Sequence, residues 1–135
     1  MVSLIAMLSS GKGTWGQVSS LISSEKWDNV YLICNEFSYK TFEINPQKAL
    51  KLQIDENKPE EIFEKLAPFF KKQIKDFEVA VNISSGTGAE HMALLSALLK
   101  AGLGLRFVYL KDNEVTEFKL LEQEFIPQDE DEYFI

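Results

Sequence analysis

The stretch "NISSGTGAEHMALL", residues 82–95, decides the fold because it joins an apolar strand to an apolar helix through a turn of small residues. The strand is "FEVAVNI" (77–83), and the helix continues to about Ala101. Glycine lets backbone N–H groups approach a ligand, and the first turn of a helix offers further N–H donors with a partial positive charge. We therefore expect this turn to bind an anion.

A second loop of the same kind follows the apolar run "VSLIAML" (2–8), which predicts a strand buried on both faces. A helix of about three turns comes next. Between Met1 and Ser24 the only ionisable side chain is Lys12, and between Val79 and Ala89 there is none. Because the net charge is −7, two loops without acids indicate anion sites. The candidate ligand-binding residues are Ser9, Ser10, Gly11, Lys12, Gly13 and Thr14 in one loop, and Asn82, Ser84, Ser85, Gly86, Thr87 and Gly88 in the other.

The remaining segments predict an alternation of strands and helices. Further strands are expected at 30–34 and 48–54, the latter at an edge, with a helix from Pro59 and a hairpin over 105–121. This order predicts an α/β Rossmann-like fold, a doubly wound, mainly parallel sheet with helices on both faces and a C-terminal β-hairpin. In the common strand order, strands 2–8 and 77–83 are neighbours, so their loops meet in the crevice where ligands bind such folds. The segment 35–46 gives no clear prediction.

Composition limits the classes of protein and ligand. The 135 residues suggest one domain (1–121) and an acidic tail (122–135), whose aromatic end could dock on a partner subunit. One cysteine excludes an intrachain disulfide, and one histidine argues against structural zinc, so we expect no metal and no cofactor. No apolar run is long enough to span a membrane and no signal peptide is evident, which favours the cytoplasm. The negative charge disfavours long nucleic acid.

The predicted helix 88–101 is apolar on more than one face. One side can pack on the sheet, and a second subunit related by a two-fold axis is the simplest cover for the other. The alternative is that the Phe-rich helix after Pro59, or the C-terminal tail, covers it within one chain. We expect a homodimer through helix 88–101.

Both loops also have plainer interpretations. They could be tight turns with good helix caps, Ser10 or Thr14 for one helix and Ser85 or Thr87 for the other. Gly11-x-Gly13-x-x-Gly16 matches the dinucleotide fingerprint, with Glu36 at the expected distance, but Ser9 and Ser10 separate the strand from the first glycine. His91 is a residue of the surface or an interface, or else a general acid–base.

With these residues in view, the chain resembles a CARF domain, the Rossmann-like ligand-sensing module of CRISPR-associated defence proteins, in a standalone form. The resemblance rests on the order of elements over residues 1–121 and on "VNISSGTGAEHMALLSALLKAGLGLRFVYL" (81–110). The Ser/Gly loop after the first strand is similar to the family's other ligand loop. Many members have lysine directly after Gly-Thr, where this chain has Gly88.

The resemblance implies a homodimer that binds cyclic oligoadenylate across its two-fold axis in antiviral defence, sensing or sequestering the ring. It places the two loops around the ligand. An alternative is a metal-independent ring nuclease, in which the ligand's 2′-hydroxyl attacks its own phosphate and Lys12, Ser10 and Thr14 are the candidate catalytic residues. A further alternative is an unrelated Rossmann-like nucleotide-binding or scaffold protein.

Overall fold

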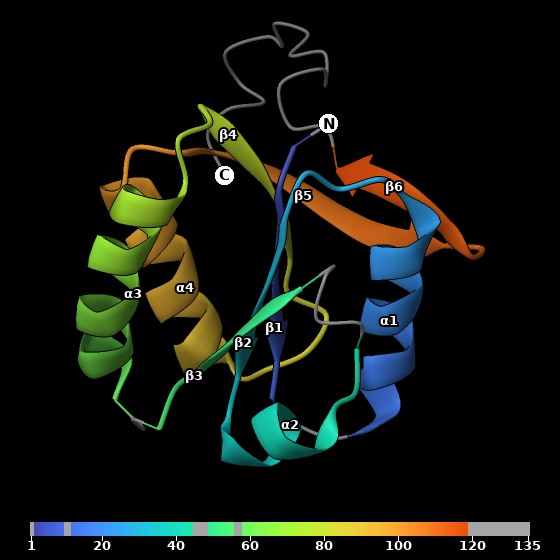
Figure 1. The fold of residues 1–135 in the computed structure, drawn as a ribbon, viewed down its shortest axis with the longest axis horizontal. Helices are drawn as coiled ribbons and strands as arrows, with labels where there is room; N and C mark the ends of the chain where they lie inside the picture. The colour runs from blue at the N-terminus through green and yellow to red at the C-terminus, as the bar shows by residue number, and fades with distance from the viewer. Residues whose placement is uncertain (1, 10–11, 45–48, 56–57, 119–135) are drawn as a thin grey trace, which may run out of the picture.

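The fold is a three-layer α/β sandwich built on one six-stranded sheet (Figure 1). A computed structural model describes residues 2–9, 12–44, 49–55 and 58–118. The strand order is β3-β2-β1-β4-β5-β6, parallel throughout except for the antiparallel pair β5–β6. The predicted Rossmann-like fold with a C-terminal hairpin is therefore confirmed. The strands are β1 (Leu4–Leu8), β2 (Val30–Cys34), β3 (Leu50–Gln53), β4 (Glu78–Asn82), β5 (Gly104–Lys111) and β6 (Glu114–Phe118).

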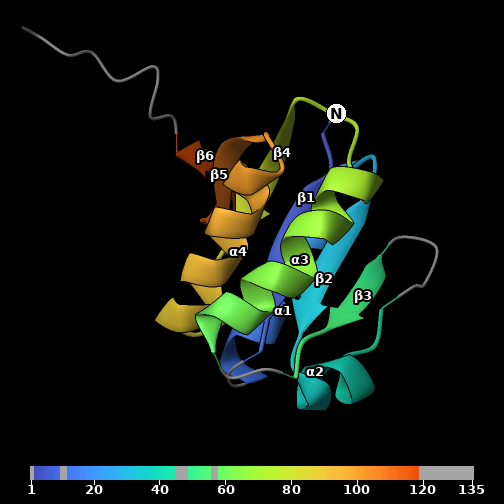
Figure 2. The ribbon, with the colours of Figure 1, turned by 90° about the vertical axis from the view of Figure 1, so that its left-hand side faces the viewer.

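Helices cover both faces of the sheet (Figures 1 and 2). α1 packs on one face, and α3 and α4 lie side by side on the other. All five residues of β1 are buried, as its unbroken apolar sequence predicts for a central strand. The helices are η1 (Lys12–Thr14, a 3₁₀ turn), α1 (Trp15–Ser24), α2 (Glu36–Thr41), α3 (Pro59–Gln73) and α4 (Gly88–Lys100).

The short helix α2 falls in the segment for which the sequence gave no prediction. Asn35 caps it, with its side-chain Oδ1 accepting a hydrogen bond from the backbone N–H of Ser38 at 2.8 Å. α2 lies at the edge where β1 and β2 end (Figure 1). This places its side chains beside the loop that follows β1.

Part of the apolar surface of α4 is covered within one chain. Leu94 and Leu98 are fully buried, in the core cluster that also contains α3 residues Leu66 and Phe70. The cover is the Phe-rich helix, so these two leucines need no second subunit. Met92 and Leu99 stay exposed, at 58% and 62%, with Leu95 half-buried between them.

The part of the chain described by the structure contains no helix that is both long and apolar enough to cross a membrane. The expected acidic tail, 122–135, lies outside the described residues, as do residues 119–121 of the predicted hairpin.

Candidate anion-binding crevice

The two loops converge at the carboxyl edge of the sheet, as the sequence predicts. β1 and β4 are paired in parallel, with Leu4 opposite Ala80 and Ala6 opposite Asn82. The backbone N–H of Ser9 donates to the side-chain Oγ of Ser85 at 3.2 Å, across 76 residues of sequence. The loop after β1 and the turn after β4 therefore meet at one place on the edge of the sheet, and we call this candidate site the β1–β4 crevice.

Gly86 shapes the turn after β4. Its φ of 107° lies where side chains are disfavoured, and a Cβ there would stand 2.6 Å from Cγ of Met7 and 3.0 Å from Nε2 of His91. The turn therefore folds tightly onto β1 only because position 86 has no side chain. This requirement gives the Ser-Ser-Gly sequence a structural cause besides any ligand.

A capping box starts α4. The Thr87 hydroxyl accepts from the backbone N–H of Glu90 at 3.2 Å, and the Glu90 carboxylate accepts from the N–H of Thr87 at 2.8 Å. The interpretation of Thr87 as a helix cap is thus correct. The N–H groups of Gly88 and Ala89 are the other donors of this first turn, and α4 itself offers them no acceptor.

Glu90 brings a carboxylate into a crevice that the loop sequences alone suggest is free of acids. Its Oε1 also accepts from the Ser9 hydroxyl at 2.5 Å, so one oxygen links the loop after β1 to the start of α4. Sequence reasoning missed this contact because Glu90 lies just beyond the turn. A capping-box pattern, threonine followed three residues later by glutamate, was the available signal.

Asn82 is buried and supports the turn after β4 through its side-chain amide. Its side-chain amide donates to the Val108 carbonyl at 2.9 Å and to the Ser84 hydroxyl at 3.0 Å, and its Oδ1 accepts from the Ser84 N–H at 3.3 Å. These bonds tie the end of β4 to β5. Asn82 therefore supports the turn rather than facing solvent.

The predicted site residues differ in their access to a ligand. Ser9, Asn82 and Ser85 are buried, and Gly86 and Thr14 are half-buried. Ser84, Thr87, Gly88 and Gly13 are exposed, and a Cβ at Gly13 or Gly88 would meet no atom within 4 Å. Open space therefore lies in front of both glycines. Thr14 occupies the cap position of α1, Lys12 begins η1, and Ser10 and Gly11 lie outside the described residues.

His91 lies against the same turn. Its Nε2 is 2.7 Å from the carbonyl oxygen of Ser85, and since a carbonyl only accepts, Nε2 is the protonated nitrogen that donates. The ring is half-buried. This hydrogen bond holds the backbone of the turn against the first turns of α4.

Two residues from the unpredicted segment hold the other side of the crevice. The Asn35 side-chain amide donates to the Ser9 carbonyl at 3.0 Å, and the Ser38 hydroxyl donates to the Leu8 carbonyl. Both bonds connect the start of α2 to the end of β1. The sequence signal was an asparagine directly after a strand, a common helix cap.

The dinucleotide interpretation finds little support in this geometry. Glu36, the residue expected to bind a ribose, forms an exposed ion pair with Lys40 at 2.8 Å. Within the described ranges, no group of three or more His, Cys, Asp or Glu residues is arranged to hold a metal ion.

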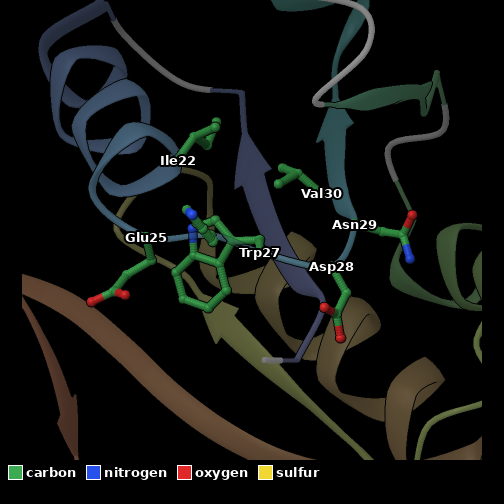
Figure 3. A pocket seen from close by; sticks show the side chains of 7 residues that line it. Ile22, Glu25, Trp27, Asp28, Asn29 and Val30 are labelled. Carbon is green, nitrogen blue, oxygen red and sulfur yellow. The ribbon is translucent and has the colours of Figure 1, made fainter.

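A separate hollow of about 240 Å³ lies at the other edge of the sheet, between the end of α1 and the start of β2 (Figure 3). Glu25 and Asp28 contribute acidic groups to its lining, and the Trp27 indole N–H donates to the Leu21 carbonyl at 3.0 Å. Lys26 also lines the hollow, but the two acids outnumber it, and the net negative charge disfavours an anion. It shares no residue with the β1–β4 crevice.

No protein-family model matches the sequence, and no curated protein shows significant similarity to it.

Proposed function

We propose that the chain is a CARF domain, a cytoplasmic homodimeric module of CRISPR-type antiviral defence that binds cyclic oligoadenylate and senses or sequesters it. The observation that supports this most is the convergence of the two small-residue loops, joined by the hydrogen bond from Ser9 to Ser85. The crevice carries the N-terminal amides of α4 and the open space in front of Gly13 and Gly88, which suit the phosphates of a ring nucleotide.

The proposed dimer interface is the outer stripe of α4, defined as Met92, Leu95 and Leu99. These residues are three and four apart and share one face of the helix. On the same side of the sheet, β5 and β6 expose Tyr109 and Phe118. Tyr109 is two residues from the core-packed Phe107 and so shares its face of the sheet, and Phe118 is paired directly with Phe107. A second copy of the chain would cover this apolar surface and bring two crevices together around one symmetric ring.

Incubation of the purified chain with cyclic tetra-adenylate and cyclic hexa-adenylate, with and without EDTA, tests the proposal by chromatography. We expect a retained, intact ring. Linear products formed in EDTA would instead support the metal-independent ring nuclease, in which Lys12, Ser10 and Thr14 stabilise charge. If neither ring binds, the result would favour the alternative of an unrelated Rossmann-like nucleotide-binding or scaffold protein.

Gly88→Asp is the sharpest variant for locating the ring. An acid in the first turn of a helix stabilises it, and space is open at this position, so the fold should persist. The new carboxylate should repel a phosphate in the crevice and weaken ring binding at least about tenfold, as a change of ~1.4 kcal/mol would. Ser20→Asp is the control and should bind normally, because it adds the same charge at an exposed position of α1, on the other face of the sheet from α4. Equal ring binding by both variants would show that the ring does not bind in the β1–β4 crevice.

A further inference from the structure

An exposed aromatic side chain stands beside the loop that follows β1. Phe37 lies on α2 and is 53% exposed, although burial of a phenylalanine side chain normally stabilises a fold. A surface hollow of about 440 Å³ surrounds it, lined by Asn35, Glu36, Phe37, Lys40 and Thr41. The hollow is a neighbour of the β1–β4 crevice, because Asn35 donates to the Ser9 carbonyl.

The backbone around Phe37 is fixed to the sheet. Asn35 caps α2 and bonds to the loop after β1, and one turn along, Ser38 is fully buried with its hydroxyl on the Leu8 carbonyl. Phe37 therefore sits on a short helix anchored at two points to the end of β1. Such a support holds an aromatic ring at a set place relative to the crevice.

The ring of Phe37 is also supported from the side. Its centroid is 5.6 Å from that of Trp15, with the planes inclined at 38°, and Trp15 in turn meets Phe42 edge-on at 5.8 Å. These contacts restrict the ring while more than half of the Phe37 surface faces solvent. A supported, half-exposed aromatic ring beside a candidate phosphate site is an arrangement that proteins use to stack nucleobases.

We propose that Phe37 is a base-stacking platform: it takes one purine base of a nucleotide ligand whose phosphate lies in the β1–β4 crevice. The hollow beside Phe37 accommodates the base, and the Lys40 and Glu36 side chains that line it offer polar contacts to the edge of the base. This inference rests on the proposed function, since it uses the same ligand, and it adds a residue that neither loop contains.

Titration calorimetry with cyclic tetra-adenylate tests the platform on four proteins: wild type, Phe37→Ala, Phe37→Tyr and Phe77→Ala. Stacking on an aromatic side chain contributes about 1–3 kcal/mol per base, so Phe37→Ala should weaken binding about 5- to 150-fold. Phe37→Tyr should retain most of the affinity because it keeps the ring. Phe77 is 94% exposed just before β4, at the other edge of the sheet, and its replacement should not change binding.

The outcomes separate this inference from the function on which it rests. Failure of the wild type to bind any ring overturns the proposed function, and the stacking site with it. Tight wild-type binding that Phe37→Ala leaves unchanged overturns the stacking site alone. Equal losses in Phe37→Ala and Phe37→Tyr also contradict stacking, because the aromatic ring would then not be what matters. Urea unfolding of each variant shows whether a loss reflects binding or the fold.

Discussion

Replacing Gly86 with alanine places a Cβ 2.6 Å from Cγ of Met7, in a backbone conformation with φ of 107°. Both the collision and the backbone strain act against the folded state. We expect the free energy of unfolding, measured with urea, to fall by about 1–3 kcal/mol. Gly16→Ala is the matched control: it lies in α1, nothing stands within 4 Å of its Cβ, and alanine favours helix. A loss of stability in Gly16→Ala as large as that in Gly86→Ala would contradict this explanation.

The buried Cys34 thiol should lower the free energy of unfolding at alkaline pH. The thiol is buried in β2, and this burial raises its pKa from 9.0 to about 11. Above about pH 9 the unfolded thiol loses its proton while the folded thiol keeps it, so the folded state binds more protons and stability falls as pH rises. Between pH 8 and pH 10, titration of this thiol should lower the free energy of unfolding by about 1 kcal/mol.

Urea unfolding at the two pH values measures this loss, with Cys34→Ala as the reference that lacks the thiol. The wild type should lose about 1 kcal/mol more than the variant between pH 8 and pH 10. Equal losses would show that the thiol does not titrate as its burial implies.

In the proposed dimer, α4 connects the ligand site to the second subunit. Its first turn closes the crevice through Thr87 and Glu90, while Met92, Leu95 and Leu99 form its outer stripe. We predict that Leu99→Asp dissociates the proposed dimer, since a charge within an apolar interface is left unpaired. Light scattering after size exclusion should show monomers at micromolar concentration.

The control for this substitution is Phe77→Asp. Phe77 is more exposed than Leu99, at 94% against 62%, but lies outside the outer stripe, so the dimer should survive. Monomeric wild type would contradict the interface, and dissociation by both variants would show that any new surface charge is enough.

Sequence patterns predicted the fully buried elements well and the mostly exposed helix α2 poorly. β1 and β2 are continuous apolar runs because they are buried on both faces, and such runs stand out in the sequence. α2 has six residues and only Ser38 is buried, too few positions to show a helical period. Its contribution to the crevice, through Asn35 and Ser38, became visible only once β1 and β2 were placed side by side.

The sequence predicted where the candidate site lies but not which side chains face it. Parallel neighbours bring their carboxyl ends to one edge, which is why the meeting of the two loops followed from strand order. Side-chain direction does not follow from strand order. Ser85 points inward to Ser9, and Glu90 folds back into the crevice, although its position in sequence lies past the turn. The all-round apolar pattern of α4 likewise could not distinguish residues buried by α3, such as Leu94, from those left outside, such as Leu99.

The molecule as a whole has an uneven charge. Of its 21 acidic residues, six lie in the 14 residues after Leu121, which contain no lysine or arginine. Residues 1–121 alone therefore carry a net charge of −1, against −7 for the whole chain. Because most of the excess negative charge lies after Leu121 in the sequence, residues 1–121 add little net charge of their own against a compact anion near the N–H donors.

Native mass spectrometry of the wild-type chain with cyclic tetra-adenylate tests the central claim most directly, because it counts chains and rings in one complex. The proposed account, one ring held by two crevices across a two-fold axis, predicts a species of two chains and one intact ring. A single chain carrying a ring, or two chains that each carry their own, would contradict it, as would a spectrum with no ring bound at all.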